Sequence, residues 1–583
     1  MEAPTGDTKS FRFGSFELDL ASRELKKGRS AAVRLQQQPF EILRLMLERP
    51  GKVVTRDEIQ QHLWPNGTFV DFEHSINAAV KRLREALDDD ADNPRFVETL
   101  PRRGYRFIAA LNAGDRERAA GTVPRLRLAV LPFMNLSDDG AQEYFTDGLT
   151  EEMIAQLGQL YRGRIGVIAR WSSMVFKGTS QRVSEIGRTL GADYLLEGSV
   201  RRTGDRVRIT ARLVESSAET DLWTETYERH VTDCIGVQTE VAQRIAHSLA
   251  LEFPSGQPLV NGGVSVSALA YQSYLRGRYE WNRPGDEGVD QALAHFVDAL
   301  RIEPGFAAAH AGVARMHIAR AEGYRGSPRI ELEAARSSAV RALELDPQQS
   351  EGHLALGDVR RMLERDWSGA SASYARAIDL NPSQENAYRA RAMMLIASSR
   401  TAEAIQSAER ACELDPLCLV VGSNAAWVSY LAGDHETALE RCRRSLDLDP
   451  QHLLARRVLA AVWLRKGRPL DAVRVLEAAR ARDSDDPVIA AWLVHAKAMS
   501  GDRRGAVELL FALRGPDGER WRAPYHVALA QVGLGDIDGA FTSLDLAVAD
   551  CDPALASLAL EPRFDPIRSD PRFARVIAAL GID

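Results

Sequence analysis

Long apolar runs are missing from this sequence of 583 residues. No stretch approaches the roughly 18 consecutive apolar residues that a membrane-spanning helix requires. The first residues, MEAPTGDTKSF, also lack the basic segment followed by an apolar one that marks a secretory signal. We therefore expect a cytoplasmic protein with no membrane partner.

Cysteine is scarce, and its positions follow no pairing pattern. The five cysteines are Cys234, Cys412, Cys418, Cys442 and Cys551, and no two of them form a CxxC motif. Zinc sites and disulfide frameworks need pairs at defined spacings, so neither is indicated. We expect small buried thiols and no metal site.

Short catalytic signatures are also missing. The sequence contains no GxxxxGK[ST] phosphate loop, no HExxH zinc motif and no GxGxxG dinucleotide motif. The stretch 535–539 (GDIDG) resembles part of a calcium loop, but Phe541 stands where such a loop requires glycine. We therefore predict that the protein is not an enzyme, with no catalytic residues and no cofactor, although a dispersed triad stays open.

Positive charge is in excess only near the N-terminus. The chain carries a net charge of −7, yet residues 1–112 hold 18 Lys and Arg against 17 Asp and Glu. Two polar stretches, 113–125 and 253–266, have the composition of linkers, and the second contains five Gly or Pro. The sequence thus predicts three domains, 1–112, 126–252 and 267–583.

The first region has the pattern of a small α+β domain that ends in a basic hairpin. Short alternating stretches within 11–20 indicate strands, and helical periodicity indicates helices at 37–48, 56–63 and 72–87. Thr55 and Glu58 have the spacing of a capping box before the second helix. Strands at 96–100 and 105–109 follow. Helix-turn-helix followed by a hairpin is the winged-helix layout.

The third expected helix is apolar along one side and polar along the other. Ile76, Val80, Leu83 and Leu87 form the apolar stripe. The candidate DNA contacts on the other side are His74, Ser75, Asn77, Ala78, Lys81 and Arg82, with Arg84 on the flank. Small residues allow close approach to DNA, Asn pairs with adenine, and Arg or Lys pairs with guanine or phosphate. A solvated helix face is the alternative.

The hairpin supplies a second positive cluster. Four arginines and one acid lie between Arg95 and Arg106, with Arg102 and Arg103 at the tip. The candidate DNA contacts of the hairpin are Arg102, Arg103 and Tyr105. In a winged helix both clusters share one surface, so the tip is placed to enter a minor groove or to clamp phosphates. We predict double-stranded DNA as the partner of residues 1–112.

Three motifs in this region, VTRDEIQQHLWP, NAAVKRLREAL and ETLPRRGYRF, resemble the winged-helix DNA-binding domain of OmpR/PhoB-type transcriptional regulators. The resemblance implies that the helix at 72–87 lies in the major groove and that the hairpin touches the minor groove. It also implies a loop that contacts RNA polymerase, with candidate residues Trp64, Pro65, Asn66, Gly67, Thr68 and Phe69. The module begins near residue 11, so we expect a one-component regulator without a receiver domain ahead of it.

The middle region alternates short strands and helices, which predicts a mixed α/β domain with one sheet. An expected hairpin at 194–214 carries an arginine-rich face, made of Arg201, Arg202, Arg206, Arg208 and Arg212. We interpret this face as solvated, with a phosphate-ligand site as the alternative. The stretches AVLPFMNLSDD, EYFTDGLTEEMIAQL and LWTETYER resemble the TolB-like N-terminal domain. That domain also occurs beside adenylate cyclase and kinase modules, but no cyclase or kinase catalytic domain is found in this sequence.

The third region repeats itself. Alanines recur at a spacing of 34 over five consecutive intervals from Ala370 to Ala540, and Pro often closes a repeat. This is the tetratricopeptide pattern, and it predicts an all-α solenoid of eight helix pairs with a cap near 574–580. The first helices of such pairs line a groove for a peptide or protein segment. The candidate groove residues are Arg389, Trp427, Tyr430, Arg457 and Tyr525, with Met393, Leu464 and His495 on the same face.

The three-part order resembles the invasion-gene regulator family of enteric bacteria. It implies a sequence-specific DNA-binding regulator whose middle and C-terminal regions sense a ligand or bind a protein partner. The alternative is a tetratricopeptide scaffold or adaptor whose winged helix mainly contacts RNA polymerase or another protein. Homo-oligomerisation is left open. Sequence-specific DNA binding separates the two hypotheses.

Overall fold

The computed structural model forms two compact units, Met1–Arg125 and Leu126–Asp583. It describes residues 10–13, 16–19, 24–27, 33–47, 53–63, 72–87, 89–90, 94–100, 104–107, 126–137, 143–160, 165–230, 266–283, 287–513 and 523–582, with scattered positions between 237 and 249. Two sets of candidate residues, 64–69 and 102–103, lie outside these ranges.

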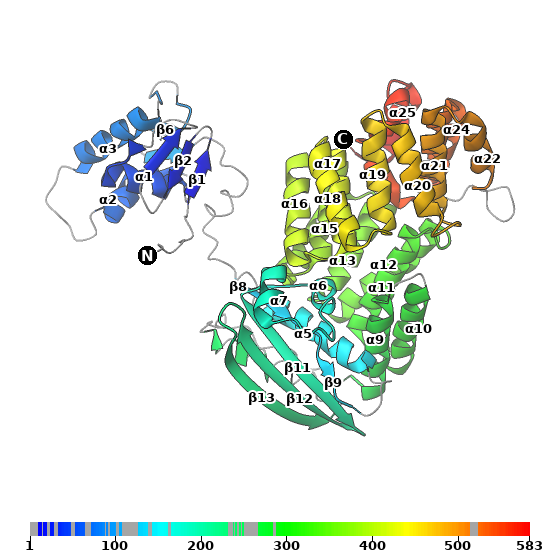
Figure 1. The fold of residues 1–583 in the computed structure, drawn as a ribbon, viewed down its shortest axis with the longest axis horizontal. Helices are drawn as coiled ribbons and strands as arrows, with labels where there is room; N and C mark the ends of the chain where they lie inside the picture. Colours follow the sequence, from blue (N-terminus) through cyan, green and yellow to red (C-terminus); the bar gives the residue numbers. More distant parts are fainter. Residues whose placement is uncertain are drawn as a thin grey trace. The chain divides into compact units, whose positions relative to one another are not determined.

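The first unit contains two antiparallel sheets and three helices among its described residues (Figure 1). Strands β1 (Ser10–Phe13), β2 (Phe16–Asp19), β3 (Glu24–Lys27) and β4 (Val33–Arg34) form one sheet in chain order. Helices α1 (Gln37–Leu47), α2 (Arg56–Leu63) and α3 (Phe72–Leu87) surround a common core. In the second sheet, β7 (Gly104–Phe107) pairs with β5 (Val53–Thr55) and β6 (Val97–Leu100). The winged-helix prediction is confirmed.

The start of α2 shows why these helices begin where the sequence predicts. The backbone N–H of Thr55 donates to Glu58 Oε2 at 2.8 Å, and the N–H of Glu58 donates to Thr55 Oγ1 at 3.2 Å. This reciprocal capping box satisfies two donors that the first turn leaves without helical partners. It also fixes Arg56, the first residue of α2, next to the third helix.

The second unit begins with a six-stranded mixed sheet. Strand β8 (Leu126–Val130) lies between its parallel neighbours β10 (Ile165–Val167) and β11 (Tyr194–Thr203). Strands β12 (Arg206–Glu215) and β13 (Thr220–His230) continue it in antiparallel order, and β9 (Met134–Asn135) pairs with β11. Helix α5 (Glu143–Leu160) follows β8, whereas α6 (Arg170–Met174) and α7 (Val183–Leu190) follow β10.

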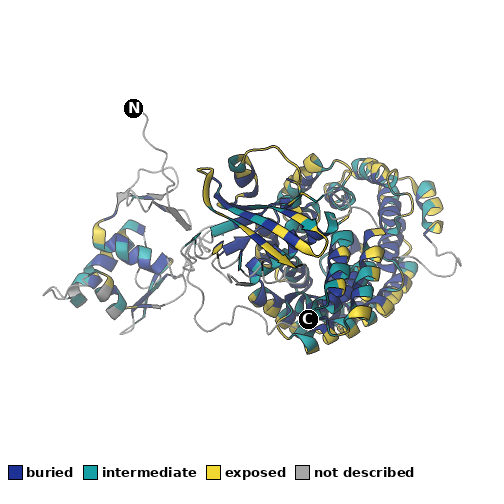
Figure 2. Ribbon diagram, turned by 90° about the horizontal axis from the view of Figure 1, so that it is seen from below, coloured by how far each residue is buried: buried dark blue, intermediate teal, exposed yellow. Residues whose placement is uncertain are grey.

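One face of this sheet is buried and the other is largely open to water (Figure 2). Val207, Ile209 and Leu213 of β12 are buried in the core. On the opposite face, Arg208 pairs with Glu228, and Arg212 pairs with Glu197. The contacts of these two arginines favour the solvated interpretation of the arginine-rich face over a phosphate site.

The rest of the second unit is a stack of helix pairs (Figure 1). Along the described chain the pairs are α9 (Ala268–Trp281) with α10 (Glu287–Ile302), α11 (Ala307–Glu322) with α12 (Pro328–Leu345), α13 (Ser350–Val359) and η3 (Arg360–Glu364) with α14 (Trp367–Leu380), α15 (Glu385–Ala397) with α16 (Thr401–Leu414), α17 (Leu419–Leu431) with α18 (His435–Leu448), α19 (Leu453–Arg465) with α20 (Pro469–Arg480), α21 (Pro487–Ser500) with α22 (Arg503–Phe511), and α23 (Pro524–Leu534) with α24 (Ile537–Ala549). Helix α25 (Pro571–Ala579) forms the cap. The eight pairs and the cap match the prediction.

The alanine period has a packing cause. The alanines that recur through the repeats are fully buried; they are Ala292, Ala335, Ala370, Ala404, Ala438, Ala472, Ala506 and Ala540. A small side chain is needed there because the two helices of a pair cross closely. Between helices, Gly433 adopts a φ of 85°, which favours glycine, and Asp434 then caps α18 by accepting from Thr437 N at 3.1 Å.

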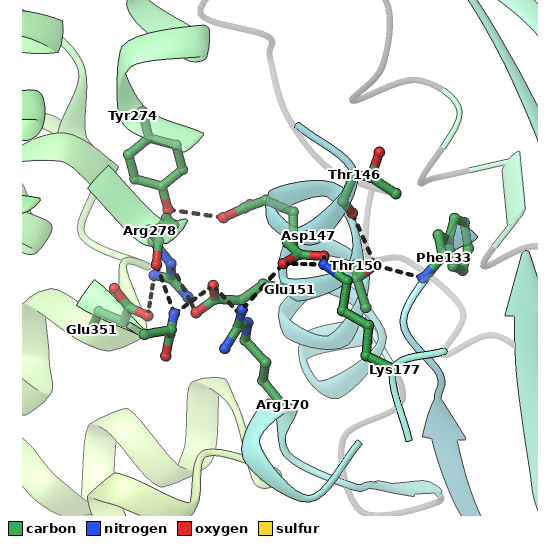
Figure 3. Close-up of polar contacts among 12 residues, drawn as sticks. Phe133, Thr146, Asp147, Thr150, Glu151, Arg170, Lys177, Tyr274, Arg278 and Glu351 are labelled. Carbon is green, nitrogen blue, oxygen red and sulfur yellow. Dashed lines mark hydrogen bonds and ion pairs between the residues drawn. The ribbon is translucent and has the colours of Figure 1, made fainter. Parts of the chain in front are cut away.

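A buried polar cluster joins the α/β domain to the first repeats (Figure 3). Arg278 of α9 donates through Nε to Glu151 Oε1 of α5 at 3.0 Å and through an Nη to Glu351 Oε1 of α13 at 2.6 Å. Tyr274 of α9 donates its hydroxyl to Glu152 Oε1 of α5 at 2.9 Å. The sequence predicts that 253–266 separates two folding units, whereas these contacts place both flanking regions in one compact unit.

The C-terminal end turns back onto the repeats, which the sequence did not predict. Two 3-10 helices, η4 (Pro553–Ser557) and η5 (Pro562–Ile567), follow α24. We call residues 552–568 the closing segment. Tyr324 donates its hydroxyl to Asp552 Oδ1 at 2.7 Å, and Trp427 donates Nε1 to Ser557 Oγ at 3.1 Å. The closing segment therefore lies against first helices of the pairs, on the face where a groove was expected.

In the part of the chain that the structure describes, no helix has both the length and the apolar character needed to cross a bilayer.

Candidate nucleic-acid interface

Helix α3 has the two-sided character that the sequence predicts. Its apolar stripe, Ile76, Val80, Leu83 and Leu87, is buried in the core of the first unit. The opposite side exposes Asn77, Lys81 and Arg82, while Ser75 and Ala78 are half-buried. The side chain of His74 lies outside the described residues, as do Arg102 and Arg103. The structure therefore brings three exposed polar side chains together on one side of α3.

Asn77 is held by two residues from other elements. Its Oδ1 accepts from the Tyr105 hydroxyl of β7 at 2.8 Å and from the two Nη atoms of Arg56 at 3.2 and 3.1 Å. Because these donors occupy the carbonyl oxygen, the amide Nδ2 is the group that Asn77 can offer to a base acceptor. Sequence reasoning missed Arg56, although its place directly after the Thr55 cap made its position predictable.

Tyr105 has a different place from the one predicted. Its side chain is only 2% exposed, and its ring packs in the core of the first unit. The Arg56 guanidinium lies 5.2 Å from the ring centroid, and the hydroxyl reaches Asn77. Tyr105 is therefore placed to position Asn77 and Arg56 from behind, rather than to lie on the outer surface of the wing.

The two arginines of α3 have distinct partners. Arg82 is exposed and donates to Gln36 Oε1 at 2.7 Å. Arg84 is half-buried and donates to the Val97 carbonyl at 2.7 Å and to Thr99 Oγ1 at 2.8 Å. Arg84 thus attaches α3 to strand β6, whereas Arg82 lies on the exposed side of α3 and has Gln36 as its partner among the described residues.

The candidate groove residues lie on the inner face of the solenoid, which we define as the side formed by the first helices of the pairs. Tyr430 and Tyr525 are buried there, and Arg389, Trp427 and Arg457 are half-buried. The Tyr430 hydroxyl donates to Glu561 Oε1 at 3.0 Å, so the closing segment covers this part of the face. The sequence predicts a groove for a peptide on this face, but in the structure the closing segment of the same chain covers Trp427 and Tyr430.

Trp492, His526 and Arg563 also lie at this inner face and were missed in the sequence, whereas His495 was predicted there. Trp492 donates Nε1 to His526 Nδ1 at 3.0 Å, and Arg563 of the closing segment lies 3.6 Å above the Trp492 ring centroid. Burial lowers the pKa of His495 to about 4 and raises the pKa of Asp552 to about 6. The prolines at 553, 562, 566 and 571 interrupt the repeat period. They could have indicated from the sequence that the helix pairs end before this segment.

Comparison with protein families agrees with the two terminal parts of this architecture. Residues 29–107 match the family described as "Transcriptional regulatory protein, C terminal". Residues 429–491 match the tetratricopeptide repeat family. The chain therefore contains an OmpR/PhoB-type DNA-binding domain and tetratricopeptide repeats.

Several curated proteins are similar to parts of the chain. The "Transcriptional regulator HilA" of Salmonella typhi is 21% identical over 448 residues, covering 76% of this chain and 77% of that protein. The "Cholera toxin transcriptional activator" of Vibrio cholerae is 31% identical over 114 residues, or 19% of this chain and 39% of that protein. The "Putative adenylate cyclase 3" of Rhizobium meliloti is 32% identical over 324 residues. The chain spans 53% of the length of that last protein, and the match covers 54% of the chain.

Proposed function

We propose that this chain, which joins an OmpR/PhoB-type DNA-binding domain to tetratricopeptide repeats, is a sequence-specific transcriptional regulator. Helix α3 enters the major groove with Asn77, Lys81 and Arg82 toward the base edges. The observation that carries the proposal is the joint exposure of these three side chains opposite a buried stripe, inside a domain that matches transcriptional regulators.

The hairpin and the loop extend this interface. Arg102 and Arg103 contact phosphates or a narrow minor groove, a proposal supported by two adjacent cations in the sequence between β6 and β7 and by the family resemblance. The loop 64–71 contacts RNA polymerase, a proposal supported by the family resemblance of its flanking motifs. Tyr105 and Arg56 support the interface by fixing the Asn77 amide.

The second unit is the sensing half of the regulator. Its α/β domain is TolB-like, which is supported by the sequence motifs and by a single mixed sheet with helices. The solenoid binds a ligand or a protein partner. The polar cluster between α5, α9 and α13 transmits a change in one part to the other, because it makes the α/β domain and the repeats one body (Figure 3).

Selection from a pool of random duplexes tests this function. The full chain is expected to enrich one sequence motif, and a Lys81→Ala/Arg82→Ala variant is expected to enrich none while staying folded. The matched control is Arg44→Ala, which removes an arginine from α1. If the wild-type chain enriches no motif but binds RNA polymerase, the scaffold hypothesis replaces this one.

A nucleotide cyclase is the second candidate, favoured only by the similarity to a protein named as a putative adenylate cyclase. Incubation of the purified chain with ATP and Mg²⁺ or Mn²⁺, followed by chromatography, decides between the two. We expect no cyclic nucleotide above the level of a boiled control. Formation of cyclic AMP that scales with protein concentration would establish an enzyme.

A further inference from the structure

The inner face of the solenoid contains a buried arginine whose hydrogen bonding is incomplete. Arg563 of the closing segment is 7% exposed and pairs with Glu561 through Nε and one Nη, both at 2.9 Å. Its other Nη is buried and has no hydrogen-bond partner within the described residues. Since buried donors are nearly always satisfied, a partner for this nitrogen is expected.

A second arginine faces the same ring. The Arg457 guanidinium of α19 lies 5.8 Å from the Trp492 ring centroid, and that of Arg563 lies 3.6 Å from it. Among the described residues, Nε of Arg457 is buried without a hydrogen-bond partner. Burial also lowers the pKa of Arg457, with Asp486 the acid that opposes this effect most. Asp486 itself caps α21 by accepting from Val488 N and Ile489 N.

A neutral donor completes the group. The Tyr525 hydroxyl is buried, again without a partner in the described part of the chain, and Arg563 influences the ionisation of both Tyr525 and Arg457. His526 adds no charge, because its Nδ1 accepts from Trp492 and its pKa lies well below the ordinary value through burial. Asp552 is occupied by donors from Tyr324, Tyr525 N and Ala554 N.

The charges in this group do not balance. In the described part of the chain, Glu561 is the only carboxylate hydrogen-bonded to either guanidinium, and it already accepts from Tyr430 and Arg563. Asp486, the acid that acts most on Arg457, is engaged in capping α21. A cation that is removed from water without a paired anion is costly, and within the described residues one donor each of Arg457, Arg563 and Tyr525 is buried without a partner. A carboxylate or phosphoryl group satisfies both needs, because its oxygens accept strong hydrogen bonds from guanidinium groups.

We propose that the inner face of the solenoid binds a small oxyanion between Arg457 and Arg563, beside the Tyr525 hydroxyl and above Trp492. This inference rests on the proposed function for its biological role, since it gives the ligand class of the sensing half. The ligand bridges α19 and α23 to the closing segment. Its presence therefore fastens that segment to the repeats.

Calorimetric unfolding of the full chain tests the site directly. Inorganic phosphate, acetate and benzoate are titrated against sodium chloride of equal ionic strength, and Tm is recorded. We expect at least one oxyanion to raise the Tm of the second unit in proportion to the logarithm of its concentration, whereas chloride has no such effect. Phosphate as the effective probe identifies a phosphoryl ligand, and acetate or benzoate identifies an organic acid.

Two variants and a control make the test specific. Arg457→Gln removes a half-buried cation whose Nε has no hydrogen-bond partner in the described part of the chain, so we expect an unchanged or higher Tm without oxyanion and no oxyanion effect. Tyr525→Phe removes one donor and weakens the response about fivefold. Arg504→Gln, at a side chain 91% exposed on α22, leaves the response unchanged.

If no oxyanion raises Tm above the chloride control, the site does not exist. If Arg457→Gln and Tyr525→Phe both keep the full response, the anion binds elsewhere and the assignment is wrong. Neither result touches the DNA-binding proposal, which is measured by duplex selection. Loss of motif selection with an intact oxyanion response would overturn that function and leave this site standing.

Discussion

At the scale of single residues, Tyr105 is proposed to position Asn77 for DNA recognition without touching DNA itself. Its buried ring places a hydroxyl at 2.8 Å from Asn77 Oδ1. We predict that Tyr105→Phe lowers affinity for the selected duplex about fivefold, because one hydrogen bond that orients Asn77 is lost. The affinity for unrelated DNA stays the same. Fluorescence anisotropy on both duplexes measures this, and an unchanged ratio of the two affinities would show that Asn77 does not need this support.

Glu561 compensates buried charge in the closing segment. It is fully buried and accepts from Arg563 and Tyr430. We predict that Glu561→Ala lowers the free energy of unfolding of the second unit by about 3–5 kcal/mol, since it leaves Arg563 buried and unpaired. Urea denaturation measures the loss. Glu508→Ala, at an exposed side chain of α22, is the control and should change this free energy by less than about 0.5 kcal/mol.

His495 gives the second unit a pH dependence of known sign. Burial holds its pKa at about 4 in the folded protein, against an ordinary value near 6.5. Between these values the unfolded chain binds the extra proton, so the contribution of His495 to stability falls as pH decreases through this window. The full effect is on the order of 3 kcal/mol.

The matched comparison is wild type against His495→Asn, by urea denaturation from pH 7.5 to pH 4. Asp552, whose pKa is raised to about 6 by burial, acts in the opposite direction and is present in both proteins. We therefore expect the free energy of unfolding of the wild type to fall relative to that of His495→Asn as pH decreases. If the free energies of unfolding of the two proteins change in parallel with pH, His495 is not a buried neutral histidine.

At the scale of elements, the sequence predicted what local signals encode. The 34-residue alanine period fixed the helix pairs because each alanine is needed at a helix crossing, and Thr55 with Glu58 fixed the start of α2. The exposed side of α3 followed from its buried stripe. Each of these features depends on residues close together in the chain, so periodicity and spacing were sufficient.

Contacts between distant residues were not predictable in the same way. Arg278 and Glu151 are 127 positions apart, and Tyr430 and Glu561 are 131 apart. Nothing local in the sequence identifies such partners. The sequence therefore placed Trp427, Tyr430 and Tyr525 on the correct face of the repeats but missed the segment that covers them. It also missed that Arg84 serves the α3–β6 contact.

Helix α9 provides the test of the joint between the α/β domain and the repeats. A fragment 267–583 should give a purely helical circular dichroism spectrum, because the described elements in this range are helices. We predict that it unfolds at lower urea than 126–583, since Tyr274 and Arg278 lose Glu152 and Glu151. A strand signal would refute the repeat assignment. Equal stability of the two fragments would mean that the polar cluster contributes no net stabilisation.

At the scale of the whole molecule, the two proposed roles, DNA recognition and sensing, belong to different compact units. A fragment 1–112 should therefore fold alone and bind the selected duplex, because its core is formed within the first unit. Size-exclusion chromatography and anisotropy of this fragment measure both properties. Folding without DNA binding would show that the second unit is required for recognition.

Specific DNA recognition by α3 and the hairpin is tested most directly by anisotropy of the full chain on selected and unrelated duplexes at several salt concentrations. Arg82→Ala should weaken the binding free energy for the selected duplex by about 1–3 kcal/mol. The ratio of affinities for selected and unrelated DNA should therefore decrease. Arg103→Ala should weaken binding to both duplexes and lower the salt slope by about 0.9, the loss of one phosphate contact. If both variants stay folded and bind both duplexes as the wild type does, the charged surface is only solvated and the chain is not a regulator that reads DNA through α3.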